Sequence, residues 1–310
     1  MDTPAGAFAG NVVGIDVGGT TIKAGRFAPD GRLIERAALP TPAEGAEIAA
    51  AVAALGRRLC DDHTTAAAAV LPGVVDPAAG VVRWSANLAW RDVPLRSQLE
   101  SELGVPVIVE HDVTAAALAE HDLTGTDLLF VGLGTGIGSA YILDGTVLRG
   151  ATGLAGEIGH VMVRSDGEPC PCGRTGCLEV YASGSGVARR YAAAGGAAAE
   201  ATAADVTAAD VVARQGIEPL AEHIWAEAVD GLAVALAAAT LLLDPARIVL
   251  GGGLAGAGER LSGPVTAALA AQLPWRPAPP VSISTLGRDA GIRGAALLAM
   301  RLVTTGVVTS

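Results

Sequence analysis

The stretch from residue 157 to residue 179, EIGHVMVRSDGEPCPCGRTGCLE, constrains the fold of this chain more than any other. It places His160, Cys170, Cys172 and Cys177 within 18 residues. Three thiolates and one imidazole can surround a tetrahedral Zn²⁺ ion without ligands from distant parts of the chain. Because four such ligands leave no position open for water, we expect a structural zinc ion that shapes a loop rather than one that attacks a substrate.

A disulfide among these cysteines is the alternative interpretation. Cys170 and Cys172 are too close in sequence to bridge comfortably, and three cysteines leave one thiol unpaired. Pro169, Gly173 and Gly176 supply the turns that a compact metal-binding loop needs. The spacing therefore favours zinc.

Two carboxylates bracket this stretch, Glu157 just before His160 and Glu179 just after Cys177. Rigidly held carboxylates accept hydrogen bonds from hydroxyl groups, which suits a polyol such as a sugar. If zinc takes one nitrogen of His160, the other is free to donate to a further oxygen. Acidic side chains beside a surface loop are also often only solvated, so the pattern by itself leaves sugar contact open.

Length and charge narrow the class of protein. At 310 residues the chain is long enough for two domains with substantial cores. Only 3% of the residues are aromatic, so we expect cores built from Val, Leu, Ile and Ala. The formal net charge is −11, and no basic stripe of the kind that phosphate backbones require is present. We therefore expect no nucleic-acid partner.

The remaining cysteine and the apolar segments bear on location. Cys60 is the only cysteine outside the bracketed stretch, which fits a reducing compartment. The first 13 residues lack a basic region and a long apolar run, so no secretion signal is expected. The longest apolar run, residues 231–243, is too short to span a bilayer. These features predict a cytoplasmic protein without a membrane segment.

A glycine-rich turn follows the first apolar run, residues 12–17. Asp16 is followed closely by Gly18, Gly19 and Thr20. Glycines at such a turn let backbone N–H groups approach an anion closely, and Thr20 adds a hydroxyl donor, so phosphate is a natural ligand. An acid at this place would repel phosphate unless a divalent cation lay between, which makes Asp16 a candidate Mg²⁺ partner, directly or through water. An ordinary hairpin turn remains the alternative.

Lys23, the only lysine of the chain, lies on the strand that resumes after this turn. Because side chains alternate along a strand, we expect it to point to solvent.

A second copy of the same pattern begins 114 residues later, with a strand at 128–133 and a glycine-rich turn at 134–138. In this register Gly18 matches Gly132 and Thr21 matches Thr135. Two similar hairpins indicate two like domains that bind one nucleotide. The sequence contains no G-x-x-x-x-G-K-[ST] motif and the second turn fails G-x-G-x-x-G, so P-loop and Rossmann interpretations are excluded.

Two candidate site residues lie between the copies. Asn87, in a loop predicted over 84–90, can both donate to and accept from sugar hydroxyls, while Trp84 and Trp90 either flank a ligand or anchor the loop by burial. Asp112 opens a helix directly after a short strand. It is either the helix N-cap or a site residue at a strand-to-helix junction.

The later part of the chain is predicted to be mostly helical, over 188–214 and 218–243. Thr207 and Asp210 form a candidate capping box in the first of these segments. A buried strand at 247–250 then delivers three glycines, at 251–253, to a helix start, which is a close-approach site for an anion or adenosine.

Taken in order, these motifs resemble the ROK family of sugar kinases and repressors. The matching segments are DVGGT at 16–20, GLGTGIG at 132–138, EIGH at 157–160, CPCGRTGCLE at 170–179 and VLGGG at 249–253. The resemblance implies an α/β protein with the actin-like ATPase (ribonuclease H-like) fold, two α/β domains with an interdomain cleft. We expect a small N-terminal domain from residues 1–113 and 292–310, and a larger domain from 114–291 that carries the zinc-binding loop and the nucleotide site.

The same resemblance implies ATP, Mg²⁺ and structural Zn²⁺ as cofactors and a homodimer or dimer of dimers. It implies Asp112 as the catalytic base for the sugar 6-hydroxyl group. The implied sugar contacts are Gly73, Asn87, His111, Asp112, Glu157, His160 and Glu179. The implied ATP contacts are Asp16, Gly18, Gly19, Thr20, Gly134, Thr135, Gly252 and Gly253. The implied metal ligands are His160, Cys170, Cys172 and Cys177 for Zn²⁺ and Asp16 for Mg²⁺.

One departure affects the substrate. The family usually has Asn-Asp with a second Asn two residues on, whereas this chain has His111, Asp112 and Thr114. The reaction type is therefore better constrained than the sugar, and ATP and polyphosphate both remain open as phosphoryl donors.

The leading hypothesis is an ATP-dependent kinase of glucokinase type, because the loop around Asn87 and Trp90 looks like that of family glucokinases. An N-acetylmannosamine, N-acetylglucosamine or fructose kinase of the same family is the alternative. A sugar sensor related to ROK repressors is less favoured, because a repressor needs a helix-turn-helix domain ahead of the first phosphate motif. A catalytically dead sugar-binding module would be expected to lack Asp16 or Asp112, and both are present.

Overall fold

The computed structural model describes residues 10–196 and 206–305, which divide into two compact units. Unit 1 comprises the chain up to Leu123, Gly150–Leu154 and the chain from Arg288 on; unit 2 comprises Thr124–Arg149 and Ala155–Gly287. The domain boundaries expected from the sequence, at 113 and 292, stay a prediction. Two expectations concern residues outside the described ranges. One is that no secretion signal lies in residues 1–9, and the other is the middle of the helix predicted over 188–214.

Unit 1 is built on a five-stranded mixed sheet of order β3-β2-β1-β4-β8. Its strands are β1 (Asn11–Val17), β2 (Thr21–Phe27), β3 (Leu33–Pro40), β4 (Thr64–Leu71) and β8 (Val107–His111). The first three form an antiparallel meander, whereas β4 and β8 run parallel to β1. The alanines of β4 are all buried, and small side chains on a central strand let helices pack closely on both faces of the sheet.

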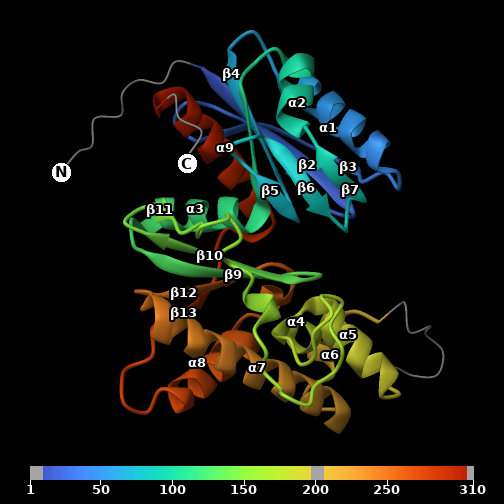
Figure 1. Ribbon diagram of the computed structural model, residues 1–310, viewed down its shortest axis with the longest axis vertical. Coiled ribbons are helices and arrows are strands. Elements are labelled where there is room, and N and C mark those ends of the chain that lie inside the picture. The colour runs from blue at the N-terminus through green and yellow to red at the C-terminus, as the bar shows by residue number, and fades with distance from the viewer. Residues whose placement is uncertain (1–9, 197–205, 306–310) are drawn as a thin grey trace. The chain divides into compact units, whose positions relative to one another are not determined.

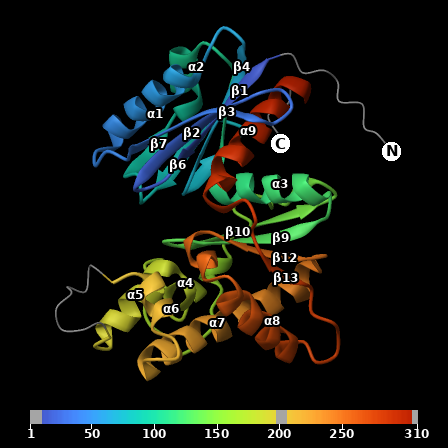
Figure 2. The same ribbon diagram turned by 180° about the vertical axis from the view of Figure 1, so that it is seen from behind.

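Helices cover both faces of this sheet (Figures 1 and 2). The helices of unit 1 are α1 (Gly45–Leu59), α2 (Leu95–Leu103), α3 (Asp112–Thr124, whose last residue belongs to unit 2) and α9 (Ala290–Thr305). On α1 the residues Ile48, Val52 and Leu59 recur at helical spacing and pack in one cluster with Ile15 of β1. On the other face α9 approaches Gly14 so closely that a Cβ atom there would lie 2.4 Å from a backbone oxygen of α9.

A small antiparallel sheet includes both ends of the loop that was predicted over 84–90. It consists of β5 (Val74–Asp76), β6 (Val81–Ser85) and β7 (Trp90–Val93). Trp90 is 4% exposed and donates its indole N–H to the Gly45 carbonyl at 2.7 Å, whereas Trp84 is 49% exposed. Burial of Trp90 therefore anchors the turn that carries Asn87, as one of the two interpretations expected. The predicted loop shortens to residues 86–89, because Trp84, Ser85 and Trp90 pair as strands.

Unit 2 repeats the sheet topology of unit 1, with the order β11-β10-β9-β12-β13. Its strands are β9 (Leu128–Leu133), β10 (Ile137–Leu143), β11 (Thr146–Val147), β12 (Ile248–Gly251) and β13 (Val281–Ile283). As in unit 1, an antiparallel meander is followed by two strands parallel to its first member.

The repeat is confirmed as a topology, but its register differs from the one read off the sequence. The β1–β2 hairpin turns at residues 18–20 and the β9–β10 hairpin at residues 134–136, so Gly18 corresponds to Gly134 at an offset of 116. The offset of 114 fits only the turns after the second strand of each copy, Asp30-Gly31 and Asp144-Gly145, because the connection after β10 is shorter than the one after β2. Strand pairing, with Val17 opposite Ile22 and Leu133 opposite Ile137, sets the true correspondence.

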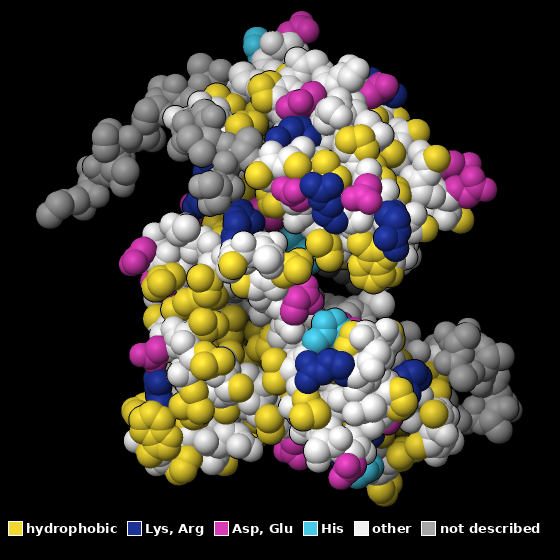
Figure 3. All heavy atoms as spheres, in the orientation of Figure 1, with side chains coloured by type: hydrophobic (Ala, Val, Ile, Leu, Met, Phe, Trp, Pro, Cys, Tyr) yellow, Lys and Arg dark blue, Asp and Glu magenta, His cyan; other side chains and the backbone are white. Residues whose placement is uncertain are grey.

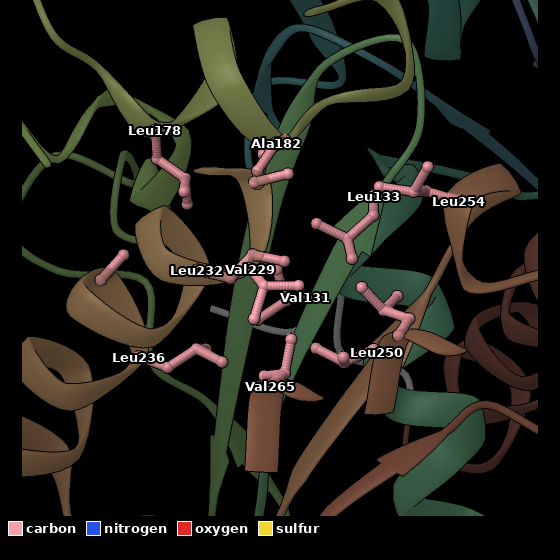
Figure 4. Close-up of a cluster of buried hydrophobic side chains, with 14 of the residues drawn as sticks. Val131, Leu133, Leu178, Ala182, Val229, Leu232, Leu236, Leu250, Leu254 and Val265 are labelled. Atoms are coloured by element: carbon pink, nitrogen blue, oxygen red, sulfur yellow. The ribbon is translucent and has the colours of Figure 1, made fainter. Parts of the chain in front are cut away.

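Helices pack against the sheet of unit 2. Its helices are α4 (Leu178–Ala182), α5 (Gly184–Ala193), α6 (Ala208–Ala213), α7 (Pro219–Leu243) and α8 (Glu259–Gln272), with short 3₁₀ turns η1 (Ile158–His160), η2 (Gly253–Ala257) and η3 (Gly287–Asp289, whose last two residues belong to unit 1). The predicted capping box of Thr207 and Asp210 is confirmed at the start of α6. Figure 4 shows the core, in which Val229, Leu232 and Leu236 of α7 meet side chains from β9 and β12.

Among the described residues, α7 is the one helix that is long and apolar enough to cross a membrane, by length and composition alone. Half of its most apolar 18-residue window is buried inside the protein, and core helices of soluble proteins have the same length and composition. On the face drawn in Figure 3, basic side chains stand in small groups among acidic, apolar and neutral ones.

Candidate functional site

The first glycine turn lies at the end of β1 in unit 1, and Asp16 stands directly before it. The cross-strand partner of Asp16 is Lys23, whose Nζ lies 3.7 Å from Asp16 Oδ2. The expectation that Lys23 points to solvent was wrong, because a half-buried carboxylate on the neighbouring strand draws it inward. Burial raises the pKa of Asp16 to about 6; Lys23 opposes that rise, and the charge of Asp112 adds to it. Asp16 and Asp112 therefore interact electrostatically.

The loop of residues 18–20, called the first loop below, has a defined hydrogen-bond pattern. Gly18 donates its N–H to the Thr21 carbonyl at 3.1 Å, and the Thr41 hydroxyl donates to the Gly18 carbonyl at 2.6 Å. For the N–H groups of Gly19 and Thr20, no protein acceptor is found in the described ranges 10–196 and 206–305. Two adjacent uncommitted N–H groups are what an anion-binding turn requires.

One predicted sugar contact, Asn87, lies close to this loop, and another, Gly73, lies at a tight crossing of the chain. A Cβ atom on Gly19 would lie 3.4 Å from Cβ of Asn87, so the Asn87 side chain stands beside the first loop. Gly73 has φ +127°, and a Cβ atom there would lie 2.4 Å from the Trp84 carbonyl oxygen. Only glycine fits at that crossing of the chain after β4.

His111 and Asp112 stand at the junction of β8 and α3. His111 Nδ1 lies 3.1 Å from Asp112 Oδ1, which also accepts the Val113 N–H at 2.7 Å. As an N-cap, Asp112 would accept from Thr114 or Ala115, and no such bond is found in the described chain. The helix begins at Asp112 itself, and His111 Nδ1 also accepts the Val113 N–H, at 3.2 Å. Asp112 is about one third exposed, so its second carboxylate oxygen is accessible as an acceptor.

The four predicted zinc ligands come together in unit 2. The ligand atoms of His160, Cys170, Cys172 and Cys177 all lie within 4.8 Å of one another. The Cys172 and Cys177 Sγ atoms are 3.7 Å apart, and Cys170 Sγ is 3.8 Å from His160 Nδ1. A tetrahedron with Zn–S bonds of about 2.3 Å has ligand separations of roughly 3.8 Å, so the donor set fits Zn²⁺.

Residues 160–177, called the cysteine loop below, owe their shape to local pairing. The three cysteines of this loop and Cys60 are all free thiols, which excludes a disulfide in the described chain. Cys170 donates its N–H to the Arg174 carbonyl at 2.7 Å, and Gly173 and Gly176 adopt positive φ angles. The predicted glycine turns therefore fold the three cysteines onto one point.

Glu157 and Glu179 occupy different surroundings. His160 Nε2, the nitrogen that points away from Cys170, lies 3.9 Å from Glu157 Oε2, and Glu157 is otherwise exposed. Glu179, in the first turn of α4, accepts the Ile137 N–H at 2.8 Å through Oε2. One oxygen of Glu179 is thus committed to the backbone of the β9–β10 hairpin, a contact that sequence reasoning did not foresee.

The loop of residues 134–136, called the second loop below, borders a cavity of about 840 Å³ within unit 2. Gly134, Thr135 and Gly253 line this cavity, as the sequence predicts for ATP contacts. Gly252 is not among the lining residues; it has φ +86°, and a Cβ atom there would lie 2.5 Å from the Leu133 carbonyl oxygen.

Other residues that line the cavity were missed by the sequence reasoning. They are mainly small or apolar side chains of α5 and α6, together with Ser185 and Arg260. The segment Ser183-Gly184-Ser185-Gly186, four residues after Glu179, was an available signal, because small residues at a helix start permit close approach of a ligand or a loop.

The model of the ROK family matches residues 12–301. The chain belongs to the ROK family. A glucokinase of Halalkalibacterium halodurans is 35% identical over 306 residues, which cover 91% of this chain and 92% of that protein. An N-acetylmannosamine kinase of Citrobacter koseri is 34% identical over 300 residues, which cover 93% of this chain and 98% of that protein.

Solved structures also resemble this ROK protein. The crystal structure of a ROK family glucokinase from Streptomyces griseus in complex with glucose and AMPPNP has a TM-score of 0.83 and 32% identity. The match covers 94% of this chain and 100% of that chain. The expected family and the actin-like ATPase fold are therefore confirmed.

Proposed function

We propose that this ROK protein is an ATP-dependent sugar kinase that phosphorylates the 6-hydroxyl group of a hexose, with glucose as its preferred substrate. The observation that carries the proposal is the likeness, over nearly the whole of both chains, to a glucokinase that binds glucose and AMPPNP. The 840 Å³ cavity, lined by Gly134, Thr135 and Gly253, supports a nucleotide ligand in this chain as well.

Phosphoryl transfer depends on placement and charge stabilisation more than on covalent chemistry. We assign Asp112 as the base that receives the proton of the sugar hydroxyl, because its accessible oxygen has no competing cap contact. The first and second loops bind phosphate oxygens through the N–H groups of Gly19, Thr20 and Thr135.

The metals have separate roles in this proposal. Asp16 supplies the hard carboxylate oxygen that Mg²⁺ prefers, and bound Mg²⁺ would neutralise phosphate charge. The four ligands of the cysteine loop would hold Zn²⁺ as a structural ion. With zinc on Nδ1, the Nε2 atom of His160 is left to donate toward Glu157 or a substrate oxygen.

We propose that four side chains bind sugar hydroxyl groups. Asn87 and His111 can donate and accept, and Glu157 and Glu179 accept. Carboxylates give the stronger, charge-assisted bonds. Gly73 contributes by the close approach that its missing side chain permits.

A second candidate substrate is N-acetylmannosamine, because the Citrobacter koseri kinase is nearly as similar to this chain as the glucokinase is. N-acetylglucosamine and fructose are further alternative substrates. A sugar sensor without DNA binding is the least favoured function.

The experiment is a coupled assay of ADP release with glucose, mannose, fructose and the two N-acetylhexosamines. We expect the highest kcat/KM with glucose, and a ranking led by an N-acetylhexosamine would replace glucose by that sugar. Polyphosphate in place of ATP, followed by the formation of sugar phosphate, tests the donor. If no sugar is phosphorylated with either donor, the kinase proposal fails.

We also propose a cytoplasmic homodimer or dimer of dimers, with neither nucleic acid nor membrane as a partner. The three free thiols of the cysteine loop support a reducing compartment, because they must stay reduced to bind zinc. Light scattering of the purified protein measures the oligomeric state, and a monomer at working concentration would contradict the proposal.

A further inference from the structure

The segment from Cys177 to Ser185 joins the last ligand of the cysteine loop to the second loop. Cys177 begins the segment as a buried metal ligand. Eight residues later Ser185 lines the cavity that also contains Thr135. The metal site and the cavity are therefore connected by one short stretch of chain, made of α4 and the start of α5.

Three contacts attach this segment to the second loop. Glu179 Oε2 accepts the Ile137 N–H at 2.8 Å, and Gly184 donates its N–H to the Gly134 carbonyl at 2.7 Å. The Ser185 hydroxyl donates to the Thr135 carbonyl. These bonds hold the loop by the carbonyl oxygens of Gly134 and Thr135 and by the N–H group that follows the loop.

Glycines make this attachment close. A Cβ atom on Gly136 would lie 2.6 Å from Glu179 Oε2, and one on Gly184 would lie 3.0 Å from the Gly134 carbonyl oxygen. The segment and the loop therefore fit against each other with no space for a side chain at either glycine.

The contacts leave a defined part of the loop free. In the part of the chain that the structure describes, the N–H groups of Thr135 and Gly136 have no protein acceptor. The Thr135 N–H was assigned above to phosphate binding, and the Gly136 N–H lies next to it, so the segment sets the place of the N–H groups that would meet the phosphate.

The segment is in turn fixed to the cysteine loop. Leu178 donates its N–H to the Val161 carbonyl at 2.9 Å, and the Glu168 N–H donates to the Tyr181 hydroxyl at 2.7 Å. The guanidinium groups of Arg164 and Arg190 lie 5.0 Å and 4.8 Å from the Tyr181 ring centroid. A change in the cysteine loop is therefore transmitted directly to α4.

We propose that Ser185 is a positioning residue for the nucleotide phosphates, and that the segment 177–185 couples metal binding in the cysteine loop to nucleotide affinity. The inference rests on the proposed function, because it assigns the second loop to ATP. It adds that loss of zinc weakens nucleotide binding through this loop, separately from any effect on the sugar.

The first test measures Kd for AMPPNP and for glucose by calorimetry on zinc-loaded protein at fixed Mg²⁺. We compare the wild type, Ser185→Ala and the control Ser97→Ala. Ser97 also donates a hydroxyl hydrogen bond to a backbone carbonyl, at 3.0 Å, but lies on α2 away from both loops. For Ser185→Ala we expect AMPPNP affinity to fall about threefold to tenfold, as for the loss of one hydrogen bond, and glucose affinity to stay within about twofold.

The outcomes distinguish a failure of the role inferred for Ser185 from a failure of the proposed kinase function. If Ser185→Ala binds AMPPNP like the wild type, or if Ser97→Ala loses as much affinity, the positioning role is overturned. If the wild type itself fails to bind AMPPNP, the proposed function fails instead.

The second test removes zinc and follows the amide hydrogen exchange of residues 134–137 together with the Kd for AMPPNP. After zinc removal we expect faster exchange at these amides and weaker AMPPNP binding. In the metal-free protein Ser185→Ala should weaken AMPPNP binding little further, because zinc removal and the substitution act on the same contact. Unchanged exchange and unchanged AMPPNP affinity after zinc removal would overturn the coupling. If the metal-free protein unfolds, the zinc-loaded double variant Glu179→Gln with Ser185→Ala tests the inference instead. Both side chains hold the second loop, so additive effects of the two substitutions on AMPPNP affinity would contradict their acting through that one loop.

Discussion

At the scale of single residues, Asp112 shows how the same residue can be read as a cap or as a catalytic group. Its position after β8 is compatible with either role. The structure gives it contacts to the Val113 N–H and to His111, but none to the N–H groups of Thr114 and Ala115, from which an N-cap at this position would accept. This geometry favours a carboxylate that is available to a ligand.

Replacing Asp112 by Asn tests the catalytic assignment. Asn caps a helix about as well as Asp, so thermal stability and AMPPNP affinity are expected to be nearly unchanged. An amide cannot accept the hydroxyl proton, and we expect kcat to fall by about two to four orders of magnitude. Asp122→Asn on the exposed end of α3 serves as the control. If Asp112→Asn kept more than about a tenth of the wild-type kcat, the assignment would pass to His111.

Asp16 predicts a pH dependence of stability. Its pKa is raised to about 6 in the folded protein, whereas an unfolded Asp titrates near 3.9. Between these values the folded state binds more protons than the unfolded state, so the contribution of Asp16 to stability falls as pH rises from about 4 to 6. The loss is on the order of 3 kcal/mol above pH 6.

Asp16→Asn removes this titration. In Mg²⁺-free buffer, urea unfolding is expected to show similar free energies for wild type and variant near pH 4, and a growing advantage of the variant toward pH 7. A difference that stays constant over this range would contradict the shifted pKa.

At the scale of elements, the two hairpin loops share one construction. In each loop a hydroxyl group from outside the hairpin donates to a loop carbonyl, Thr41 to Gly18 and Ser185 to Thr135. In each, two consecutive N–H groups are left without a partner in the described chain. The hydroxyl donors were not predictable from the turns themselves, because they lie 23 and 50 residues away from their acceptors in sequence.

Thr41→Val keeps the shape of the side chain and removes the hydroxyl. We expect the KM for ATP to rise about threefold to tenfold, the range for one lost hydrogen bond, with little change in sugar KM. Thr266→Val is the control, because the Thr266 hydroxyl makes the same kind of bond to a carbonyl, at 2.7 Å, on the exposed side of α8. An equal effect in both variants would remove Thr41 from the site.

The cysteine loop also leads to a prediction, about the metal content of the protein. Purified protein should contain about one zinc per chain by elemental analysis, and Cys172→Ser should lower that content because it removes one of the four ligands. We expect the substitution to lower both thermal stability and sugar affinity, since the loop places Glu157 and His160. Fully active protein without metal would disprove a structural zinc site.

At the scale of the whole molecule, the two units repeat one strand order, and the sequence contained enough to predict this repetition. The paired glycine turns and Asp-Gly turns predicted two like domains. The register was off by two residues, because sequence similarity followed the Asp-Gly turns while hydrogen bonding between strands fixes the hairpins. By its contacts, α3 up to Leu123 belongs to unit 1.

The sequence by itself determined the features that depend on local spacing. These are the four ligands of the cysteine loop, the two glycine turns and the strand that delivers Gly252 and Gly253, because their chemistry is set by neighbours a few residues away. Only the tertiary structure decided which distant groups meet them. The pairing of Lys23 with Asp16 arises from strand register, and the contact of Glu179 with Ile137 arises from the packing of α4 on the β9–β10 hairpin. Such contacts join residues whose distance along the chain carries no periodic signal, so they exist only once the sheets and helices have packed.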